Sequence, residues 1–437
     1  MRGRRQARLT VVTALAVLAL TAAACSNSSG SSGGGSTSSG NGGATDVGVT
    51  ANSITVGSIA TATGSLSQGF GEIVAGAKAY FHLINDQGGV YGRHLNLAYT
   101  ADDQGNPTTD EVVARNLVEQ NHVFAVIPVG TPFFSSAQYL TQTGTPTFGY
   151  VVSTAFAPGA NLYGAYGSIL DYTTGGTTST FVAHQLQAKS VAVVAYGIAQ
   201  SADACKADAS KMRADGVNVS VEDLNFPIGG DPAPDVLQMQ SKHVDMLLTC
   251  IQGSDNLAFA RLMHQYGLSN AHAVWLNGYD RHVIAQNPTL LNGTIFLIQH
   301  VPFEAAVDYP GKYPAIDQYI ATMKKYEPQW VYDDISFQGY VNAEQLVEGL
   351  RAIGPDVTQK KLVAAINQEK AFNANGLMSP VDWTTSHTIA NPPFCSSFVE
   401  AQNGTTHIVF AQHGSQVLIC FNKTDPNPLP LPPGVPG

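Results

Sequence analysis

An alternation of buried strands and amphipathic helices between Ile54 and Thr131 constrains the fold of this chain more than any other feature. The run ITVGSIA alternates β-branched and small residues and predicts a buried strand. A glycine-rich turn follows, and then apolar residues at helical spacing. Two more strands, HLNLAYT and VFAVIPV, flank a helix for which Thr108 and Glu111 form a candidate capping box. Strand, helix, strand, helix, strand with short turns predicts an α/β fold with an open parallel sheet.

Length and charge narrow the class of protein. A chain of 437 residues exceeds one typical domain, which favours two lobes. The net charge is −10, or −14 once the four arginines of the first eight residues are left out. An acidic surface argues against nucleic acid, because phosphates require clustered Lys and Arg. The glycines of the first turn lack the third glycine of a dinucleotide fingerprint, so nucleotide binding is not predicted either.

The N-terminus has the pattern of a targeting segment. A basic stretch from Arg2 to Arg8 precedes an apolar stretch from Leu9 to Ala23 that is too short to span a bilayer comfortably. The sequence LTAAAC resembles a lipobox, which predicts a lipoprotein signal peptide at 1–24 and lipid attachment at Cys25. An ordinary signal peptide that happens to precede a cysteine is the alternative. Residues 25–52 contain a Ser/Gly-rich linker and are expected to be a flexible tether.

Four motifs in chain order resemble one family. They are TGSLSQGFG, INDQGGVYGRHL, ADDQGNP and AVIPVGT. Together they are similar to the periplasmic-binding-protein type 1 family and, within it, to leucine/isoleucine/valine-type solute receptors of ABC importers. The resemblance implies two Rossmann-like lobes with parallel central sheets, joined by a hinge that the chain crosses three times. The expected division is 53–170 plus 301–376 for lobe 1, 171–300 plus 377–424 for lobe 2, and a disordered Pro-rich tail at 425–437.

The resemblance also implies a function. The protein is expected to capture a small polar solute between its lobes and to deliver it to an ABC importer. A branched-chain amino acid-like compound, an amide or a small carboxylate would fit. The expected partners are the permease subunits and the membrane, through the N-terminal lipid, with the protein itself extracytoplasmic and monomeric. A surface ligand-sensing receptor of the same fold is the alternative function.

No enzymatic motif is found in the sequence. It has no HExxH, no GxSxG elbow and no P-loop, and its histidines are scattered. The adjacent pair Asp102–Asp103 is interpreted as a solvated turn that helps to cap the following helix. We therefore expect no catalytic residue, no cofactor and no metal.

Ligand contacts are expected at the carboxyl ends of strands, where helix N-termini also favour an anion. Gly130, Thr131, Val151 and Ser153 match the family's site for a substrate α-carboxylate, and their hydroxyls serving only as helix caps is the alternative. Phe70 is found where relatives place an aromatic residue that packs on the ligand. The complete predicted set is Ser65, Phe70, Gly130, Thr131, Val151, Ser153, Thr154, Gln200, Tyr279 and Asp280.

Two positions depart from the family pattern. A tyrosine common in relatives is replaced by Gln200–Ser201, and the carboxylate for an ammonium group is uncertain. Tyr279 and Asp280 are its candidates, with Asp280 as a helix cap the alternative. These departures keep an aliphatic amide, a urea-like solute and a small aromatic acid open as ligands.

Four cysteines remain beside Cys25, an even number in an exported chain. Sequence alone allows three pairings. Their positions relative to the expected strands favour Cys205–Cys250 and Cys395–Cys420. The close paired spacings of a zinc site are missing.

Overall fold

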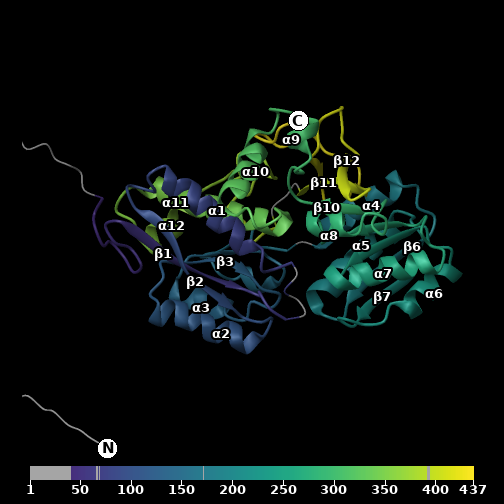
Figure 1. Ribbon diagram of the computed structural model, residues 1–437, viewed down its shortest axis with the longest axis horizontal. Coiled ribbons are helices and arrows are strands. Elements are labelled where there is room, and N and C mark those ends of the chain that lie inside the picture. Colours follow the sequence, from purple (N-terminus) through teal and green to yellow (C-terminus); the bar gives the residue numbers. More distant parts are fainter. Residues whose placement is uncertain (1–40, 65–66, 68, 171, 391–393) are drawn as a thin grey trace, which may run out of the picture. The chain divides into compact units, whose positions relative to one another are not determined.

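Two sheets, each covered by helices on both faces, organise the computed structural model (Figure 1). The structure describes residues 41–64, 67, 69–170, 172–390 and 394–437. The predicted signal peptide, the lipid-acceptor Cys25 and most of the predicted tether lie outside the described residues, as does Ser65.

The first sheet contains five parallel strands in the order β2-β1-β3-β4-β5. These strands are β1 (Ser53–Ala60), β2 (His94–Asp102), β3 (Ala125–Gly130), β4 (Thr147–Gly149) and β5 (Leu162–Gly164). Every residue of β3 is buried, as expected for a strand covered on both faces. Its alternate residues contact opposite layers: Ile127 packs with α1 and α11, whereas Val126 packs with α2 and α3.

The helices of this lobe come from two separate stretches of the chain. The first stretch supplies α1 (Ile73–Asp86), α2 (Pro107–Arg115), a π-helical turn (Asn116–Gln120), α3 (Ala137–Thr143) and a short 3-10 turn (Thr154–Phe156). The second supplies α9 (Ala305–Asp308), α10 (Pro314–Tyr326), α11 (Asp334–Ile353) and α12 (Gln359–Ile366). Figure 1 shows α1 and α11 on one side of the sheet and α2 and α3 on the other.

In the second sheet, the first five strands in chain order are parallel to one another, and the last three strands pair antiparallel at one edge. Its order is β12-β11-β10-β9-β8-β6-β7, with β13 paired to β11. The strands are β6 (Val191–Tyr196), β7 (Val219–Phe226), β8 (Met246–Cys250), β9 (His272–Trp275), β10 (Ile295–Ile298), β11 (Phe394–Gln402), β12 (Thr405–Val409) and β13 (Ile419–Phe421). The α/β class with two parallel-sheet lobes is confirmed, and the antiparallel strands β11 to β13 are an addition at one edge.

The helices of the second lobe are α4 (Tyr172–Gln185), α5 (Ala199–Ala214), α6 (Ala233–Ser241), α7 (Gly253–Gln265) and α8 (Arg281–Gln286). Strand β6 shows how they divide between two faces. Val191, Val193 and Ala195 pack toward α4 and α5, and the residues between them pack toward α6 and α7. The period of two in a strand produces this division.

The chain passes between the two sheets three times. It leaves the first sheet after β5, returns after β10 to form α10 to α12, and goes back to the second sheet at β11. The residue boundaries of the lobes at 170/171, 300/301 and 376/377 remain a prediction.

Two local expectations were wrong. The cap of α2 is Asn106, whose side chain accepts hydrogen bonds from the backbone N–H groups of Thr108 and Thr109, so Thr108 and Glu111 do not form the capping box. Pro107 at the first helical position fixes this start, because its missing N–H needs no partner there.

The Pro-rich tail at 425–437 had been expected to be disordered, but it packs against the rest of the chain. Asn373 donates a hydrogen bond of 3.0 Å to the carbonyl of Gly434, and the Leu429 N–H donates to the carbonyl of Cys420 at 2.8 Å. Val435 is buried. A proline-rich segment lacks N–H donors, but its carbonyls and its apolar side chains still find partners in the lobes.

Helices α1 and α11 cross at very short range because each has a glycine at the contact. A Cβ built on Gly76 would lie 1.7 Å from the carbonyl oxygen of Ser336, and one on Gly339 would lie 1.8 Å from that of Ile73. Tyr80 and Tyr340 extend the contact with an edge-on ring pair at 4.7 Å. This crossing joins the first and second stretches of lobe 1.

We expect Gly339→Ala to lower the free energy of unfolding by about 1–3 kcal/mol or more, because the methyl group must push two helix backbones apart. Chemical denaturation measures this change. The matched control is Lys78→Ala on α1, which alters a partly exposed side chain and should stay close to the wild type. A Gly339→Ala protein as stable as the control would contradict the close crossing.

Glu344 on α11 gives the fold a pH dependence. It is buried, accepts a hydrogen bond of 2.6 Å from Asn375, and has its pKa raised by burial to about 8 from an ordinary value of 4.5. Between these two values the folded chain holds a proton that the unfolded chain releases, so stability falls as pH rises across that window.

Replacing Glu344 by Gln should therefore raise the melting temperature at pH 8 and change it little at pH 4.5. Thermal unfolding at both pH values tests this expectation. Glu111→Gln, at an exposed carboxylate of α2, serves as the control and should not show the pH-dependent gain. An equal effect of Glu344→Gln at both pH values would contradict a raised pKa.

Candidate functional site

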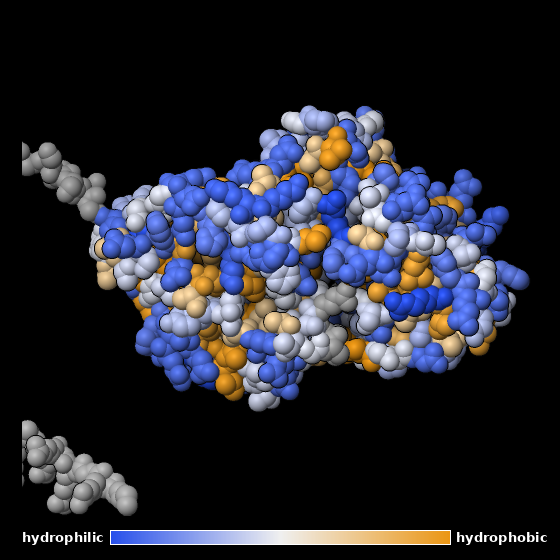
Figure 2. Space-filling view, in the orientation of Figure 1, coloured by the Kyte–Doolittle hydropathy of each residue, from blue (hydrophilic) through white to orange (hydrophobic). Residues whose placement is uncertain are grey.

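A cavity of about 300 Å³ lies between the two lobes and is lined by both of them. From the first lobe it takes Phe70, Pro132, Tyr150, Val151 and Tyr166, and from the second Tyr196, Gln200, Gln252, Leu276 and Asn277. Most of its wall is apolar or aromatic, in contrast to the mainly hydrophilic face of the molecule in Figure 2.

The position of the cavity follows from strand direction. Tyr150 comes directly after β4, Gln252 after β8, Asn277 after β9 and Gln299 after β10. The carboxyl ends of parallel strands meet at one edge of a sheet, so these loops gather there in each lobe. The two edges face the same cavity.

Helix α5 begins at the cavity and is held there by one hydroxyl. The Ser201 side chain accepts a hydrogen bond from the N–H of Tyr196 at 2.8 Å and donates to the carbonyl of Cys250 at 2.6 Å. It thereby joins the start of α5 to the ends of β6 and β8. Gln200 is held in the cavity wall as a result.

Two hydrogen bonds cross directly from lobe to lobe beside the cavity. Gln200 of the second lobe donates to the carbonyl of Pro132 at 2.8 Å, and Tyr150 of the first donates to the Asn277 side-chain oxygen at 3.3 Å. Burial raises the pKa of Tyr150, and nearby Asp334 raises it further, so the phenol stays a neutral donor. Phe70 packs on Tyr150 with 5.9 Å between the ring centroids.

A smaller hollow of about 50 Å³ adjoins the cavity and is acidic. Its wall includes Glu72, Asp280, Asp333 and Asp334, and it shares Asp334 with the cavity. Burial raises the pKa of Glu72 and of Asp333. Among the described residues that line the two spaces there is no Lys, Arg or His.

The structure brings half of the predicted ligand-binding residues to these spaces. Phe70, Val151 and Gln200 line the cavity, and Tyr279 and Asp280 line the smaller hollow. Besides Gln200, two of them already have protein partners. The Tyr279 hydroxyl donates to the Glu304 carboxylate, and Asp280 caps α8 by accepting from the N–H groups of His282 and Val283. The capping role that the sequence left open for Asp280 is present.

The described walls do not include the other strand-end candidates, Gly130, Thr131, Ser153 and Thr154. Thr131 is buried and its hydroxyl donates to Asp103, while Ser153 caps the short 3-10 turn. Their contact with a ligand stays a prediction.

Asp103 is not in a solvated turn, contrary to the interpretation from sequence. It is fully buried and accepts hydrogen bonds from Thr61 at 2.6 Å, from Thr131 and from the N–H of Gly105. The carboxylate thus joins the ends of β1 and β3 below the cavity. The Thr131 hydroxyl is therefore already engaged within the first lobe.

Sequence reasoning missed several lining residues. Tyr150, Tyr166 and Tyr196 supply three phenols, and Gln252 and Asn277 supply two amides. The available signal was position: Gln252 directly follows the expected strand VDMLLTCI, and Tyr150 and Asn277 lie in the C-terminal halves of the expected strands PTFGYVVS and AVWLNGYD. Tyr166 carried no such signal beyond a Gly/Tyr-rich passage.

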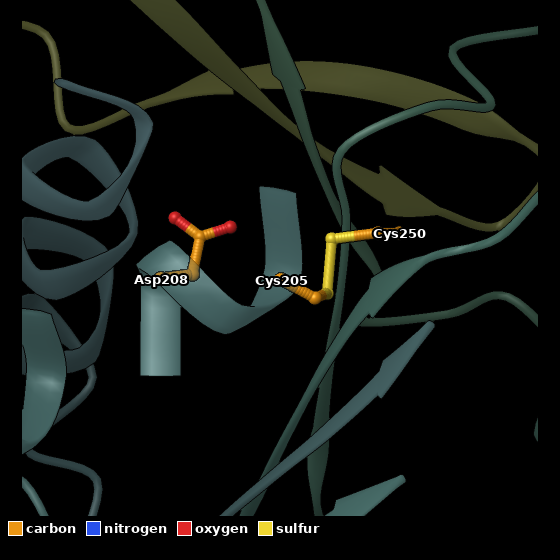
Figure 3. Close-up of side chains that lie close together, drawn as sticks. All are labelled: Cys205, Asp208 and Cys250. Carbon is orange, nitrogen blue, oxygen red and sulfur yellow. A yellow bond between two sulfur atoms is a disulfide. The ribbon is translucent and has the colours of Figure 1, made fainter. Parts of the chain in front are cut away.

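Both predicted disulfides are present, Cys205–Cys250 and Cys395–Cys420. The first joins α5 to the end of β8 beside the cavity, and Figure 3 shows Asp208 next to it. Cys205, Asp208 and Cys250 have the proximity of a metal site, but the two sulfurs are bonded to each other and are not thiolates. In the described part of the chain this trio is the only such group with metal-binding proximity.

The comparisons with known proteins agree with this geometry. The family model for periplasmic binding proteins matches residues 53–405. The structure of a fatty acid ABC transporter substrate-binding protein from Thermomonospora curvata superposes with a TM-score of 0.70 at 20% identity, covering 85% of this chain and 96% of that one. Among curated proteins no sequence match was found.

Two further structures show the same fold. A solute-binding protein of an ABC transporter from R. palustris, in complex with benzoate, has a TM-score of 0.68 at 15% identity, with 88% of this chain and 99% of that one covered. A leucine binding protein from Thermotoga maritima has a TM-score of 0.67 at 15% identity, with 81% and 97% covered.

A chain with these two lobes and this cavity is a solute-binding protein rather than an enzyme. It belongs to the periplasmic binding protein family, of type 1, as its four sequence motifs predicted. The family is extracytoplasmic. In the part of the chain that the structure describes, every helix is too short or too polar to cross a membrane.

Gln200→Ala should weaken the direct contact between the lobes. One hydrogen bond contributes about 0.5–1.5 kcal/mol, so we expect a modest shift of the free protein toward a more extended form. Small-angle scattering would report it as a larger radius of gyration. The control is Gln238→Ala at an exposed position of α6, and a Gln200→Ala profile identical to the control would contradict the role of this bond.

Proposed function

We propose that the protein captures a small solute in the cavity between its lobes and delivers it to the permease of an ABC importer. The observation that carries this proposal is the cavity itself, which is lined from both lobes at the carboxyl ends of their strands. A solute bound there contacts both lobes at once, so it stabilises the form in which they are close. The permease then distinguishes the loaded receptor from the empty one by the distance between the lobes.

The wall of the cavity favours a solute with an apolar body and few polar groups. Leu276, Leu297 and Ile169 supply aliphatic surface and Phe70 an aromatic ring. The similar structures are named for a fatty acid, benzoate and leucine, which all carry an apolar body. A branched-chain amino acid-like compound, an amide or a small carboxylate fits this description, and a strongly hydrated sugar does not.

We also propose that the protein is held at the cell membrane by a lipid on Cys25 and acts as a monomer. The lipobox-like LTAAAC and the Ser/Gly-rich residues that follow support a tethered receptor. Such a tether allows the lobes to dock on a membrane partner while the lipid stays in the bilayer.

A thermal-shift screen tests the capture of a solute. Leucine, benzoate, hexanoate, isobutyramide and 3-methylbutylamine form a suitable panel, with ribose as a hydrated negative control. A ligand at 100 times its Kd raises the free energy of unfolding by about 2.7 kcal/mol. We expect at least one apolar-bodied compound to raise the melting temperature.

Phe70→Ala should remove most of that gain, since the ring forms part of the wall. Trp330→Ala, at an exposed aromatic residue, is the matched control and should keep the gain. If no compound of the panel stabilises the wild type, or if Phe70→Ala responds like the control, the proposed capture between the lobes is wrong.

A further inference from the structure

The wall of the cavity contains one buried carboxyl group whose role the fold does not explain. Asp208 is on α5, one turn after Cys205, and only 1% of its surface is exposed. It lines the cavity, and no donor among the described residues reaches its Oδ1 atom. A buried carboxyl oxygen without a partner is costly, because the group has lost its hydration without compensation.

Among the described residues, the side chains that adjoin Asp208 in the cavity wall are neutral. From α4 these are Thr178 and Ser179, which also line the cavity, and the Ser179 hydroxyl lies close enough to Asp208 to influence its pKa. On the other side is the Cys205–Cys250 disulfide, with an Asp208 oxygen within 4.8 Å of both sulfurs (Figure 3). Lys211, the next cation along α5, is paired with Asp215 at 2.5 Å.

The elements around Asp208 are tightly packed. A Cβ on Gly176 of α4 would lie 2.7 Å from the Cβ of Lys211 and 3.1 Å from the carbonyl of Ala207, so α4 and α5 touch beside Asp208. The disulfide fixes α5 to β8 on the opposite side. Asp208 therefore has little freedom to turn toward bulk water.

We propose that Asp208 receives a primary amine of the bound solute, and that the solute class is small amines with an apolar body. The ammonium group would supply the missing donor and the missing positive charge in one contact. The cavity offers no basic side chain among its described lining residues. Its other carboxylate, Asp334, already lies 3.1 Å from the His300 ring nitrogen, which leaves Asp208 as the carboxyl group for a cation. This inference rests on the proposed capture of a solute in the cavity.

The titration of Asp208 supports the same assignment. Burial raises its pKa to about 7, and the Ser179 hydroxyl opposes that rise. An ammonium ion binds the deprotonated carboxylate, so affinity for an amine should rise between pH 6 and pH 8. The amine itself stays protonated over this range.

Three probes with the same branched body test the proposal: 3-methylbutylamine, 3-methylbutanol and 3-methylbutanoate. Their affinities for the full chain are measured by calorimetric titration at pH 6 and pH 8. At pH 8 we expect the amine to bind about tenfold or more tightly than the alcohol, as a charge-assisted hydrogen bond to a buried group requires. The carboxylate should be the weakest of the three.

Asp208→Asn should remove the preference for the amine and its rise with pH, while binding of the alcohol changes little. The matched control is Asp203→Asn, at an exposed carboxylate of the same helix, which should keep both. If Asp208→Asn fails to fold, the wild-type pH profile decides alone, and a flat profile overturns the proposal. Equal binding of amine and alcohol overturns it too.

The two proposals can fail separately. If the amine shows no advantage but other apolar-bodied compounds stabilise the protein, the assignment of Asp208 is wrong and capture in the cavity stands. If nothing binds at all, both are wrong.

Discussion

The common direction of neighbouring strands is the constraint on which the rest of this structure depends. Pairs β1–β3 and β3–β4 in one sheet, and β6–β8 and β8–β9 in the other, are all parallel. Each parallel strand must return by a helix on a face of the sheet, so all the loops after the strands collect at one edge. The cavity is the space between two such edges. Much of its wall is therefore formed by the one to three residues that follow each strand.

The two lobes are connected by three passages of the chain between them. The second crossing returns α10, α11 and α12 to the first sheet, where the glycine-mediated contact of α1 and α11 anchors them. The Asp333–Ser336 capping box starts α11 close to the cavity, and Asp334 beside it lines the wall. Events at the site are thus connected to the longest helix of the lobe. Among the described residues, polar contacts between the lobes beside the cavity include Gln200–Pro132, Tyr150–Asn277 and His300–Asp334, and a bound solute would add to them.

The sequence predicted what depends on periodicity and on order along the chain. The strands around Ile54 and Val126, the two-lobe α/β architecture and both disulfides follow from patterns that burial and strand spacing impose. The side-chain roles at the site were harder. The Thr131 hydroxyl donates to Asp103, a partner 28 residues away in sequence that no local pattern reveals, and its contact with a ligand stays a prediction. Asp208 belongs to a helical segment without a recognisable motif. It lines the cavity only because α4, α5 and the disulfide pack around it.

Capture between two moving lobes is tested most directly by the distance between the lobes in solution, with and without a stabilising solute. Spin labels at Val112 on α2 and Leu237 on α6 would report it, because both side chains are exposed and belong to different lobes. We expect a shorter and narrower distance distribution when a solute from the screen is added. A distribution unchanged by a solute that demonstrably binds would contradict capture between two moving lobes.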